Sequence, residues 1–313
     1  MELMLERIEQ RAGAQAHLYP LDLKLVPNAI TVLLGATQAG KTTLMRVMAG
    51  LDKPHAGRVL VDGADVTGKS VRDRNVAMVY QQFINYTSMT VADNIASPLR
   101  LRKESDIDAR VLELARKLHI EPFLQRMPGE LSALFAAGRS TVVYATTEPT
   151  EALLLGGWTA VMDAGELLQY GPTAEVFHRP KSIRVARAFS DPPMNLIAGT
   201  ASPQGVALPG GGVLACALPA GASGTLTVGV RAGALGVRER PGDLALAGVV
   251  ELAEISGSDT FVHAKTAVGE LVAQLTGVHV FELGSTITLY LHPGQAYVFG
   301  QDGNLLVAPK EQH

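Results

Sequence analysis

The sequence predicts an α/β protein in which a helix-covered sheet is followed by a smaller, all-β second domain. Strand and helix patterns alternate along the first half, which favours a mainly parallel sheet. A glycine-rich turn links the apolar run 29–34 to a helical pattern that opens at Thr42. From Val228 onward, short β-like runs are separated by Gly, Pro and Asp turns, which is typical of an OB-like barrel. We therefore expect two domains, 1–195 and 196–313.

The composition indicates a folded chain without extreme charge. Its 313 residues exceed the usual size of one domain, and a hydrophobic fraction of 47% is sufficient for sizeable cores. The net charge of −3 disfavours nucleic-acid binding through bulk positive charge. Pro and Gly interrupt the charge-free stretch 192–230 too often for a membrane span, and 1–10 lacks the apolar core of a signal peptide. The single cysteine, Cys216, excludes an intrachain disulfide and favours a reducing compartment.

The first elements follow from apolar spacing. Leucines in the segment 21–25 alternate with polar residues and predict a half-buried strand. The apolar run 29–34 predicts a second strand, and the run 42–48 predicts the helix after it. Valines in the segment 59–61 alternate beside glycines and predict a strand, and 75–80 is a further apolar strand. These elements give the strand–turn–helix order around the glycine-rich turn.

The following elements lead to the end of the first domain. Ser105 is a candidate helix cap. Apolar residues at steps of four, three and four predict one buried face of that helix, formed by Ile107, Val111, Leu114 and Leu118. The β-branched run 140–146 predicts a strand, and 159–169 predicts a hairpin that turns at 163–165.

The strongest motif joins the strand 29–34 to the following helix. It fits the pattern G-x-x-x-x-G-K-[ST] and consists of Gly35, Ala36, Thr37, Gln38, Ala39, Gly40, Lys41 and Thr42. Backbone N–H groups of such a loop and the positive end of the helix can surround the charges of a triphosphate. We expect Lys41 to reach the β- and γ-phosphates, Thr42 to ligate Mg²⁺, and Thr43 to adjoin the nucleotide. The alternative is a glycine-rich turn that contains a lysine by chance.

Motifs after this loop narrow the function. They are the segments 48–52, 57–59, 65–68, 72–81 and 90–95. Together with the loop, they resemble the ATP-binding subunits of ABC transporters that serve carbohydrate and polyol importers. The stretches 80–86 and 144–149 are most similar to glycerol-type uptake systems. The resemblance implies a P-loop ATPase fold, and it identifies Gln81 as the glutamine that senses Mg²⁺ and the γ-phosphate and faces the membrane subunits.

The same resemblance extends through the second domain. It rests on 161–165, 171–172, 228–231, 255–260 and 291–294, which are similar to the end of the ATPase domain and to the OB-like regulatory domain of these importers. It implies ATP and Mg²⁺ as cofactors, Lys41 and Gln81 as catalytic residues, and Thr42 and Gln81 as Mg²⁺ ligands. The implied partners are two transmembrane permease subunits, a second ATP-binding subunit in a homo- or heterodimer, and, indirectly, a periplasmic or extracellular substrate-binding protein. Such a subunit is peripheral, at the cytoplasmic face of the inner (plasma) membrane, and powers uptake of a sugar or of a polyol such as glycerol.

One stretch departs from the family pattern. Glu130, Leu131 and Ser132 begin the signature loop, but Ala133 continues at once with residues similar to a later helix. A strand flanked by two helices needs roughly 40 residues, so we expect the signature loop, the Walker B strand and the general base to be absent. The Walker B strand is interior in related sheets, so its loss leaves unpaired backbone or forces new pairing. We hypothesise a deletion near 132–133, either real or produced by an incorrect gene model, and expect inefficient hydrolysis.

Several residues have competing interpretations. The strand 140–147 ends near Glu148 and superficially mimics Walker B, but the resemblance identifies it as the switch strand, with Thr147 in place of the histidine that could carry a proton. Tyr19 is a candidate for stacking on adenine, and the alternative is a tyrosine of the core or of a loop. Gln81 has an alternative role as a polar residue that closes a strand. The run 72–74 is expected to form a solvated turn.

Two other functions are consistent with parts of the sequence. A nucleotide-binding regulatory module without efficient ATPase activity fits the missing segment. An unrelated P-loop kinase would share the phosphate loop, although no acceptor-site motif supports it. The eight histidines include no pair at i, i+4 and have no accompanying cysteine cluster, so a metal-binding motif is not expected.

Overall fold

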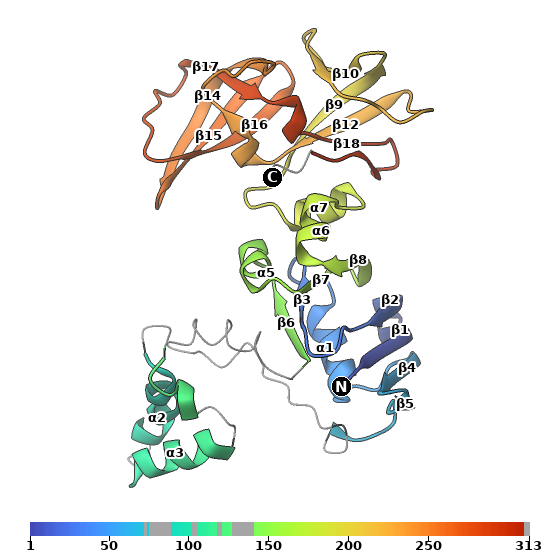
Figure 1. Cartoon of the computed structure of the whole chain (residues 1–313), viewed down its shortest axis with the longest axis vertical. Helices are drawn as coiled ribbons and strands as arrows, with labels where there is room; N and C mark the ends of the chain where they lie inside the picture. Colours follow the sequence, from blue (N-terminus) through green and yellow to red (C-terminus); the bar gives the residue numbers. More distant parts are fainter. Residues whose placement is uncertain (72–73, 75–88, 102–104, 118–120, 127–140, 310–313) are drawn as a thin grey trace.

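The computed structural model describes residues 1–71, 74, 89–101, 105–117, 121–126 and 141–309 (Figure 1). Several predictions fall elsewhere in the chain. Those outside the described residues concern 72–73, the strand 75–80, Gln81, Leu118 and the junction 132–133.

The sheet that carries the glycine-rich loop has the strand order β6-β3-β7-β8. The central strand β3 (Ile30–Leu34) pairs in parallel with β6 (Val142–Thr146) and with β7 (Trp158–Asp163). β8 (Glu166–Pro172) pairs antiparallel with β7 through the predicted turn at 163–165. All residues of β3 are buried, as expected for an apolar strand between two neighbours.

The N-terminal strands form a separate antiparallel sheet. Its order is β2-β1-β4-β5, and its strands are β1 (Leu3–Ala12), β2 (Gln15–Lys24), β4 (Ala56–Val61) and β5 (Ala64–Asp65). The alternating leucines of β2 are buried as predicted, but they belong to this sheet. The prediction of one mainly parallel sheet is therefore wrong for these strands. Clean alternation is typical of an antiparallel sheet with one solvated face, and β1 and β2 form a hairpin.

Helix α1 (Lys41–Ala49) contributes its apolar face to the core between the two sheets. Leu44, Val47 and Met48 belong to one buried cluster with leucines of β1 and β2 and with residues of β3 and β7. The other face of the parallel sheet packs against the helices α5 (Pro149–Leu155), α6 (Thr173–His178) and α7 (Ile183–Ala188). The loop between β3 and α1 therefore begins at the end of a strand that is packed on both faces.

Arg74 differs from its prediction. It is 3% exposed, so the expected solvated turn at 72–74 is wrong for this residue. Its guanidinium donates to the carbonyl oxygens of Val47 and Met48, at 3.2 Å each. Two more hydrogen bonds reach the carbonyl oxygens of Lys69, at 3.1 Å, and Thr67, at 2.9 Å. Carbonyls in the last turn of a helix have no partner within the helix, so Arg74 closes the C-terminal end of α1.

Two helices of the middle segment pack against one another. They are α2 (Val91–Leu101) and α3 (Ile107–Lys117). Val111 and Ala115 are buried, whereas Leu114 is 42% exposed, so the predicted apolar face is wrong at Leu114. Val111 and Ala115 are one turn apart and share a face, which explains their common burial. The first helical hydrogen bond is accepted by the carbonyl of Asp106, so Asp106 and not Ser105 occupies the cap position.

The C-terminal β-region, residues 195–307, consists of two antiparallel sheets around one buried apolar cluster. The first sheet contains β9 (Asn195–Ser202), β10 (Gly205–Ala207), β11 (Val213–Ala215), β12 (Thr225–Val230), β18 (Tyr297–Phe299) and β19 (Leu305–Val307). The second contains β13 (Leu235–Gly236), β14 (Leu244–Ser256), β15 (Asp259–Thr266), β16 (Gly269–Thr276) and β17 (Thr286–Leu291). Short 3₁₀ helices lie at Glu121–Phe123, Ala232–Ala234 and Pro293–Gln295. None of the helices within the described ranges is long and apolar enough to cross a bilayer.

Candidate functional site

The glycine-rich loop leaves the carboxyl end of β3 and ends where α1 begins at Lys41. Gly40 precedes the helix with φ of 95°, a left-handed conformation that favours glycine. Gly35 is required for space, because a Cβ atom there would lie 2.1 Å from the carbonyl oxygen of Met162. A Cβ atom on Gly40 would likewise lie 2.8 Å from Cδ2 of Leu18. The two motif glycines therefore allow the loop to pack directly on β7 and β2.

Main-chain hydrogen bonds hold the loop against the turn between β7 and β8. The carbonyl oxygen of Ala39, which is buried, accepts from the amide of Gly165 at 3.2 Å. The carbonyl oxygen of Gly165 accepts from the amide of Tyr19 at 3.0 Å. The turn thus connects the loop to strand β2 of the antiparallel sheet, and it fixes the position of the loop at the end of β3.

Lys41 is the cation of the loop. Its Nζ donates to the carbonyl oxygens of Gly35, at 2.6 Å, and Ala36, at 2.8 Å. Burial lowers the pKa of the Lys41 ammonium below its usual value. The first turn of α1 carries no acidic residue, so the positive end of the helix and the ammonium act on the same space. Gln38 and Thr42 are exposed beside it, and the arrangement suits a phosphate-like anion.

The end of β6 lies beside the start of the loop, because Thr146 pairs in register with Leu34. Thr147 and Glu148 follow and are exposed. The Thr146 hydroxyl donates to a carboxylate oxygen of Glu151 at 2.5 Å and accepts from the Glu148 amide at 2.9 Å. The turn after β6 is therefore held by Thr146 and by Glu151 of α5, and Thr147 follows directly after the residue that pairs with Leu34.

The structure gives less information on the remaining predicted site residues. Tyr19 is 49% exposed on β2, so it is neither a core tyrosine nor a loop tyrosine, and stacking on adenine stays a prediction. Gln81 lies outside the described residues. No cluster of three or more His, Cys, Asp or Glu side chains suited to a metal occurs in the described part of the chain.

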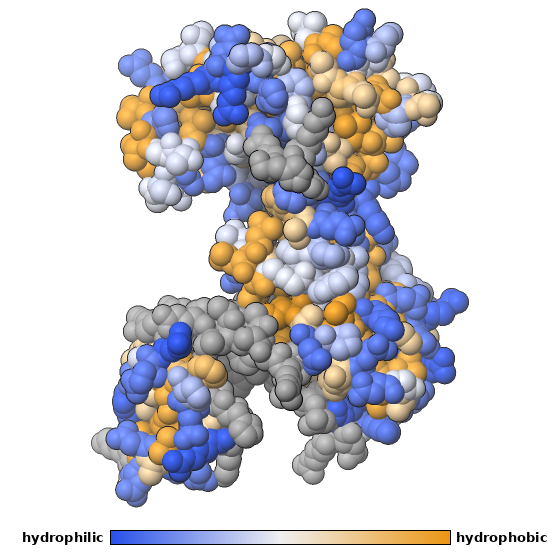
Figure 2. Space-filling model, viewed as in Figure 1, coloured by the Kyte–Doolittle hydropathy of each residue, from blue (hydrophilic) through white to orange (hydrophobic). Residues whose placement is uncertain are grey.

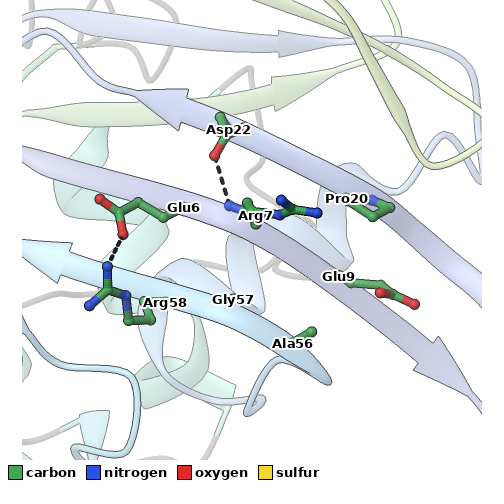
Figure 3. Close-up of a pocket in the computed structure, with 8 residues that line it drawn as sticks. All are labelled: Glu6, Arg7, Glu9, Pro20, Asp22, Ala56, Gly57 and Arg58. Carbon is green, nitrogen blue, oxygen red and sulfur yellow. Dashed lines mark hydrogen bonds and ion pairs between the residues drawn. The ribbon is translucent and has the colours of Figure 1, made fainter.

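A hollow lies on the antiparallel sheet and shares no residue with the loop (Figure 3). It is lined by Glu6, Arg7, Glu9, Pro20, Asp22, Ala56, Gly57 and Arg58. Arg58 donates to Glu6 at 2.6 Å, and the Arg7 amide donates to Asp22 at 2.8 Å. Because Glu6, Arg58 and Asp22 already have partners within this hollow, the phosphate-binding loop is the better candidate site.

Comparison with known proteins decides the family. The family model described as "ABC transporter" matches residues 18–144, and the model described as "TOBE domain" matches 228–299. The sn-glycerol-3-phosphate import ATP-binding protein UgpC of Yersinia enterocolitica is 30% identical over 91% of this chain and 93% of its own length. The chain belongs to the ABC transporter family. The alpha-glucoside transport ATP-binding protein AglK of Rhizobium meliloti is 28% identical to this ABC protein, over 96% of this chain and 98% of the relative.

Membership of this family confirms several predictions. The P-loop ATPase fold and the β-rich C-terminal domain are those that the sequence predicts. Membership also excludes the alternative of an unrelated P-loop kinase. As a member of the ABC transporter family, the chain binds nucleotide. The two matched regions lie on either side of the segment 145–227, which includes α5, α6 and α7.

The alignments also measure how much shorter this ABC protein is. The alignment with UgpC runs over 336 positions, whereas 91% of 313 residues is about 285. About 50 positions of that alignment therefore face no residue of this chain. The difference is close to the roughly 40 residues that a strand with two flanking helices requires.

Sequence reasoning misses the residues that support the loop. It predicts a hairpin over 159–169 that turns at 163–165, and it uses 161–165 only for the family resemblance. In the structure, Met162 packs against Gly35 and Gly165 is bonded to Ala39. The signal in the sequence is the glycine at position 165, which ends the turn. In the structure its φ is 84°, and a Cβ atom there would lie 2.7 Å from the carbonyl oxygen of His17. A glycine directly after a tight turn often marks such a close approach of two backbones.

Proposed function

We propose that this chain is the ATP-binding subunit of an ABC importer that takes up a sugar or polyol, with glycerol-type compounds as the favoured class. The observation that carries the proposal is the cradle of Lys41, Gly35 and Gly40 at the carboxyl end of β3, in a chain of this family. Likeness to a glycerol-3-phosphate import protein over nearly the full chain supports the substrate class. Likeness to an alpha-glucoside transport protein widens that class to sugars.

ATP binding uses groups that are already oriented. Lys41 exchanges its two carbonyl partners for the β- and γ-phosphates, which offer full negative charge. Amides of the loop and the positive end of α1 stabilise the same phosphates. Beside the phosphates, the nucleotide site includes Ala36, Thr37, Gln38, Ala39 and Thr43, and Tyr19 is its residue for stacking on adenine.

Mg²⁺ fits this site only with help from the nucleotide. The exposed Thr42 hydroxyl is one oxygen ligand, and Gln81 is the second protein ligand in the proposal. Mg²⁺ keeps several waters and is usually bound through one or two protein groups and substrate phosphates, so a carboxylate cage is not required. Bound there, the ion neutralises charge on the phosphates.

The partners follow from the same proposal. Two permease subunits provide the path across the membrane, since the helices described here are too short to do so. A second ATP-binding subunit completes the nucleotide sandwich, and a binding protein delivers substrate to the permeases. The chain then lies at the cytoplasmic face of the plasma membrane, and its regulatory domain begins at about residue 196.

A nucleotide-binding regulatory module is the second candidate. The roughly 50 alignment positions without a counterpart favour it, because their number is enough to account for a missing Walker B strand and signature loop. Loss of a general base typically lowers the rate by a factor of about 10² to 10⁴. Thr147 contributes a hydroxyl but no proton transfer near neutral pH.

Titration of the purified chain with MgATP tests the proposal. Lys41→Ala should weaken binding by about tenfold or more, because it removes a charge-assisted contact. Lys53→Ala is the matched control, since Lys53 is an exposed lysine in the turn just after α1. Turnover in the presence of permease-containing membranes supports the importer subunit, and binding without turnover supports the regulatory module. Equal affinities for the wild type and the Lys41→Ala variant would refute the site.

A further inference from the structure

Helix α7 is joined at its start to the C-terminal β-region. The amide of Ile183 donates to the carbonyl oxygen of Gly303, at 3.0 Å. The amide of Leu305 donates to the carbonyl oxygen of Lys181, also at 3.0 Å. These main-chain bonds connect the first turn of α7 to the hairpin between β18 and β19. The start of α7 therefore follows any displacement of that hairpin.

The end of α7 is held by the same region. Arg231 of the C-terminal β-region donates to the carbonyl oxygen of Phe189 at 2.8 Å and to the hydroxyl of Ser190 at 2.9 Å. Ala186, on the buried side of α7, shares a cluster with residues of β18. Figure 1 shows α7 between this region and the parallel sheet. Both ends of α7 are therefore bonded to the C-terminal β-region, while Val185 of the same helix packs against the parallel sheet.

One side chain of α7 reaches toward the nucleotide loop. Arg184 Nε donates to a carboxylate oxygen of Asp163 at 2.8 Å, and its Nη1 donates to Glu166. Asp163 and Glu166 stand on the two sides of the β7–β8 turn. A planar guanidinium is suited to bind both carboxylates at once, because its N–H donors point in fixed directions. Arg184 therefore grips the turn from both sides.

The β7–β8 turn, which Arg184 binds, also supports the phosphate loop. Gly165 in the turn donates to Ala39, and the carbonyl oxygen of Met162 lies directly against Gly35. No side chain intervenes at either contact, so a displacement of the turn passes directly to the loop. The chain of contacts runs from the β18–β19 hairpin through α7 and Arg184 to the turn and the loop.

We infer that Arg184 is a positioning residue for the phosphate loop and couples the C-terminal β-region to the nucleotide site. The inference rests on the proposed function for the identity of the ligand, ATP. A ligand or partner that shifts the C-terminal β-region changes ATP affinity through this contact, and by reciprocity ATP changes the affinity for that partner. The Arg184 side chain is 45% exposed, so its ion pairs are partly screened by water and the effect of removing them is limited.

Hydrogen exchange and ATP titration of the full chain test the inference. Arg184→Gln should speed exchange of the Gly165 and Tyr19 amides several-fold without nucleotide, and it should weaken ATP binding about threefold to fivefold. Arg187→Gln is the matched control, because Arg187 is another exposed arginine of the same helix. Arg184→Lys keeps the charge but not the fork and should fall between the wild type and Arg184→Gln. The lysine variant also serves if the glutamine variant does not fold.

The outcomes separate the inference from the proposed function. Faster exchange and weaker binding in Arg184→Gln alone, with an unchanged unfolding midpoint, support the coupling. Unchanged exchange at Gly165 and Tyr19 overturns it, as does an equal response of the Arg187→Gln control. A wild-type chain that does not bind ATP defeats the proposed function, whereas the exchange measurement still reports whether Arg184 holds the loop.

Discussion

The guanidinium carbon of Arg231 lies 3.9 Å from the centroid of the Phe177 ring, in a cation–π contact. The same side chain donates to the carbonyl oxygens of Phe177, at 3.0 Å, and Phe189, at 2.8 Å. A cation over an aromatic ring is stabilised by the negative face of the ring. One side chain of the C-terminal β-region thus holds the ends of both α6 and α7.

Replacing Arg231 should weaken this joint strongly. Arg231→Ala removes the cation–π contact and the guanidinium donor of the Phe177 and Phe189 carbonyl oxygens, of which Phe177 keeps the Tyr297 hydroxyl. We therefore expect the free energy of unfolding to fall by about 2–3 kcal/mol. Urea denaturation followed by circular dichroism measures the change. Arg238→Ala is the control, because Arg238 is an exposed arginine of the same region and its removal should cost less than about 0.5 kcal/mol. Equal losses for the two variants would show that the joint contributes nothing.

Gly35 should tolerate no side chain. The Cβ atom of Gly35→Ala would lie 2.1 Å from the carbonyl oxygen of Met162, and neither backbone can yield without moving the loop or β7. We expect ATP affinity to fall by about tenfold or more, since the loop amides and Lys41 lose their alignment. Gly68→Ala is the matched control, because a Cβ atom there meets nothing within 4 Å. Isothermal titration with ATP measures both, and an unchanged affinity in Gly35→Ala contradicts the packing argument.

The phosphate loop is predictable from sequence because its information is local. The glycines at 35 and 40, Lys41 and the flanking strand and helix patterns lie within about 20 consecutive residues, and each has a direct steric or electrostatic reason. Arg74 is not predictable in this way. Its acceptors at Val47 and Met48 are more than 25 positions away, so only the fold brings them to it.

Strand pairing in the sheets is likewise not predictable from local sequence. The alternating leucines of β2 predict a strand and its buried face, but they do not state which strand pairs with it. Arg184 looks like an ordinary surface arginine in the sequence. Its contact with Asp163 joins two elements about 20 residues apart, and its importance comes from the loop on the other side of that turn.

Arg74 should be important for the stability of α1. Arg74→Ala leaves the buried carbonyl oxygen of Met48 without a donor, whereas that of Val47 keeps the Gly50 amide. With the two further hydrogen bonds of the guanidinium also lost, we expect the free energy of unfolding to fall by about 3 kcal/mol. Arg58→Ala is the control, because Arg58 forms an exposed ion pair with Glu6 that is worth less than about 1 kcal/mol. Thermal denaturation compares the two variants. A loss for Arg74→Ala no larger than that for Arg58→Ala would contradict its role in closing the helix.

Tyr144 should give the fold a distinct response to alkaline pH. Its hydroxyl donates to Glu151 at 2.9 Å, and burial together with that carboxylate raises the pKa of Tyr144 to about 12. An unfolded tyrosine has a pKa of about 10, so between these values the unfolded chain releases a proton that the folded chain retains. The free energy of unfolding therefore falls as pH rises through this window, and it does so less steeply in Tyr144→Phe.

Near neutral pH the wild type should be the more stable of the two proteins. Tyr144→Phe loses a hydrogen bond to a partly exposed carboxylate, so it should be less stable than the wild type by about 0.5–1 kcal/mol. Urea denaturation at pH 7, 9, 10.5 and 11.5 should show this difference shrinking above about pH 10, because titration of the other tyrosines and lysines is common to both proteins. A difference that stays constant up to pH 11.5 would mean that the Tyr144 hydroxyl ionises equally easily in the folded and unfolded chains, and that the bond to Glu151 does not constrain it.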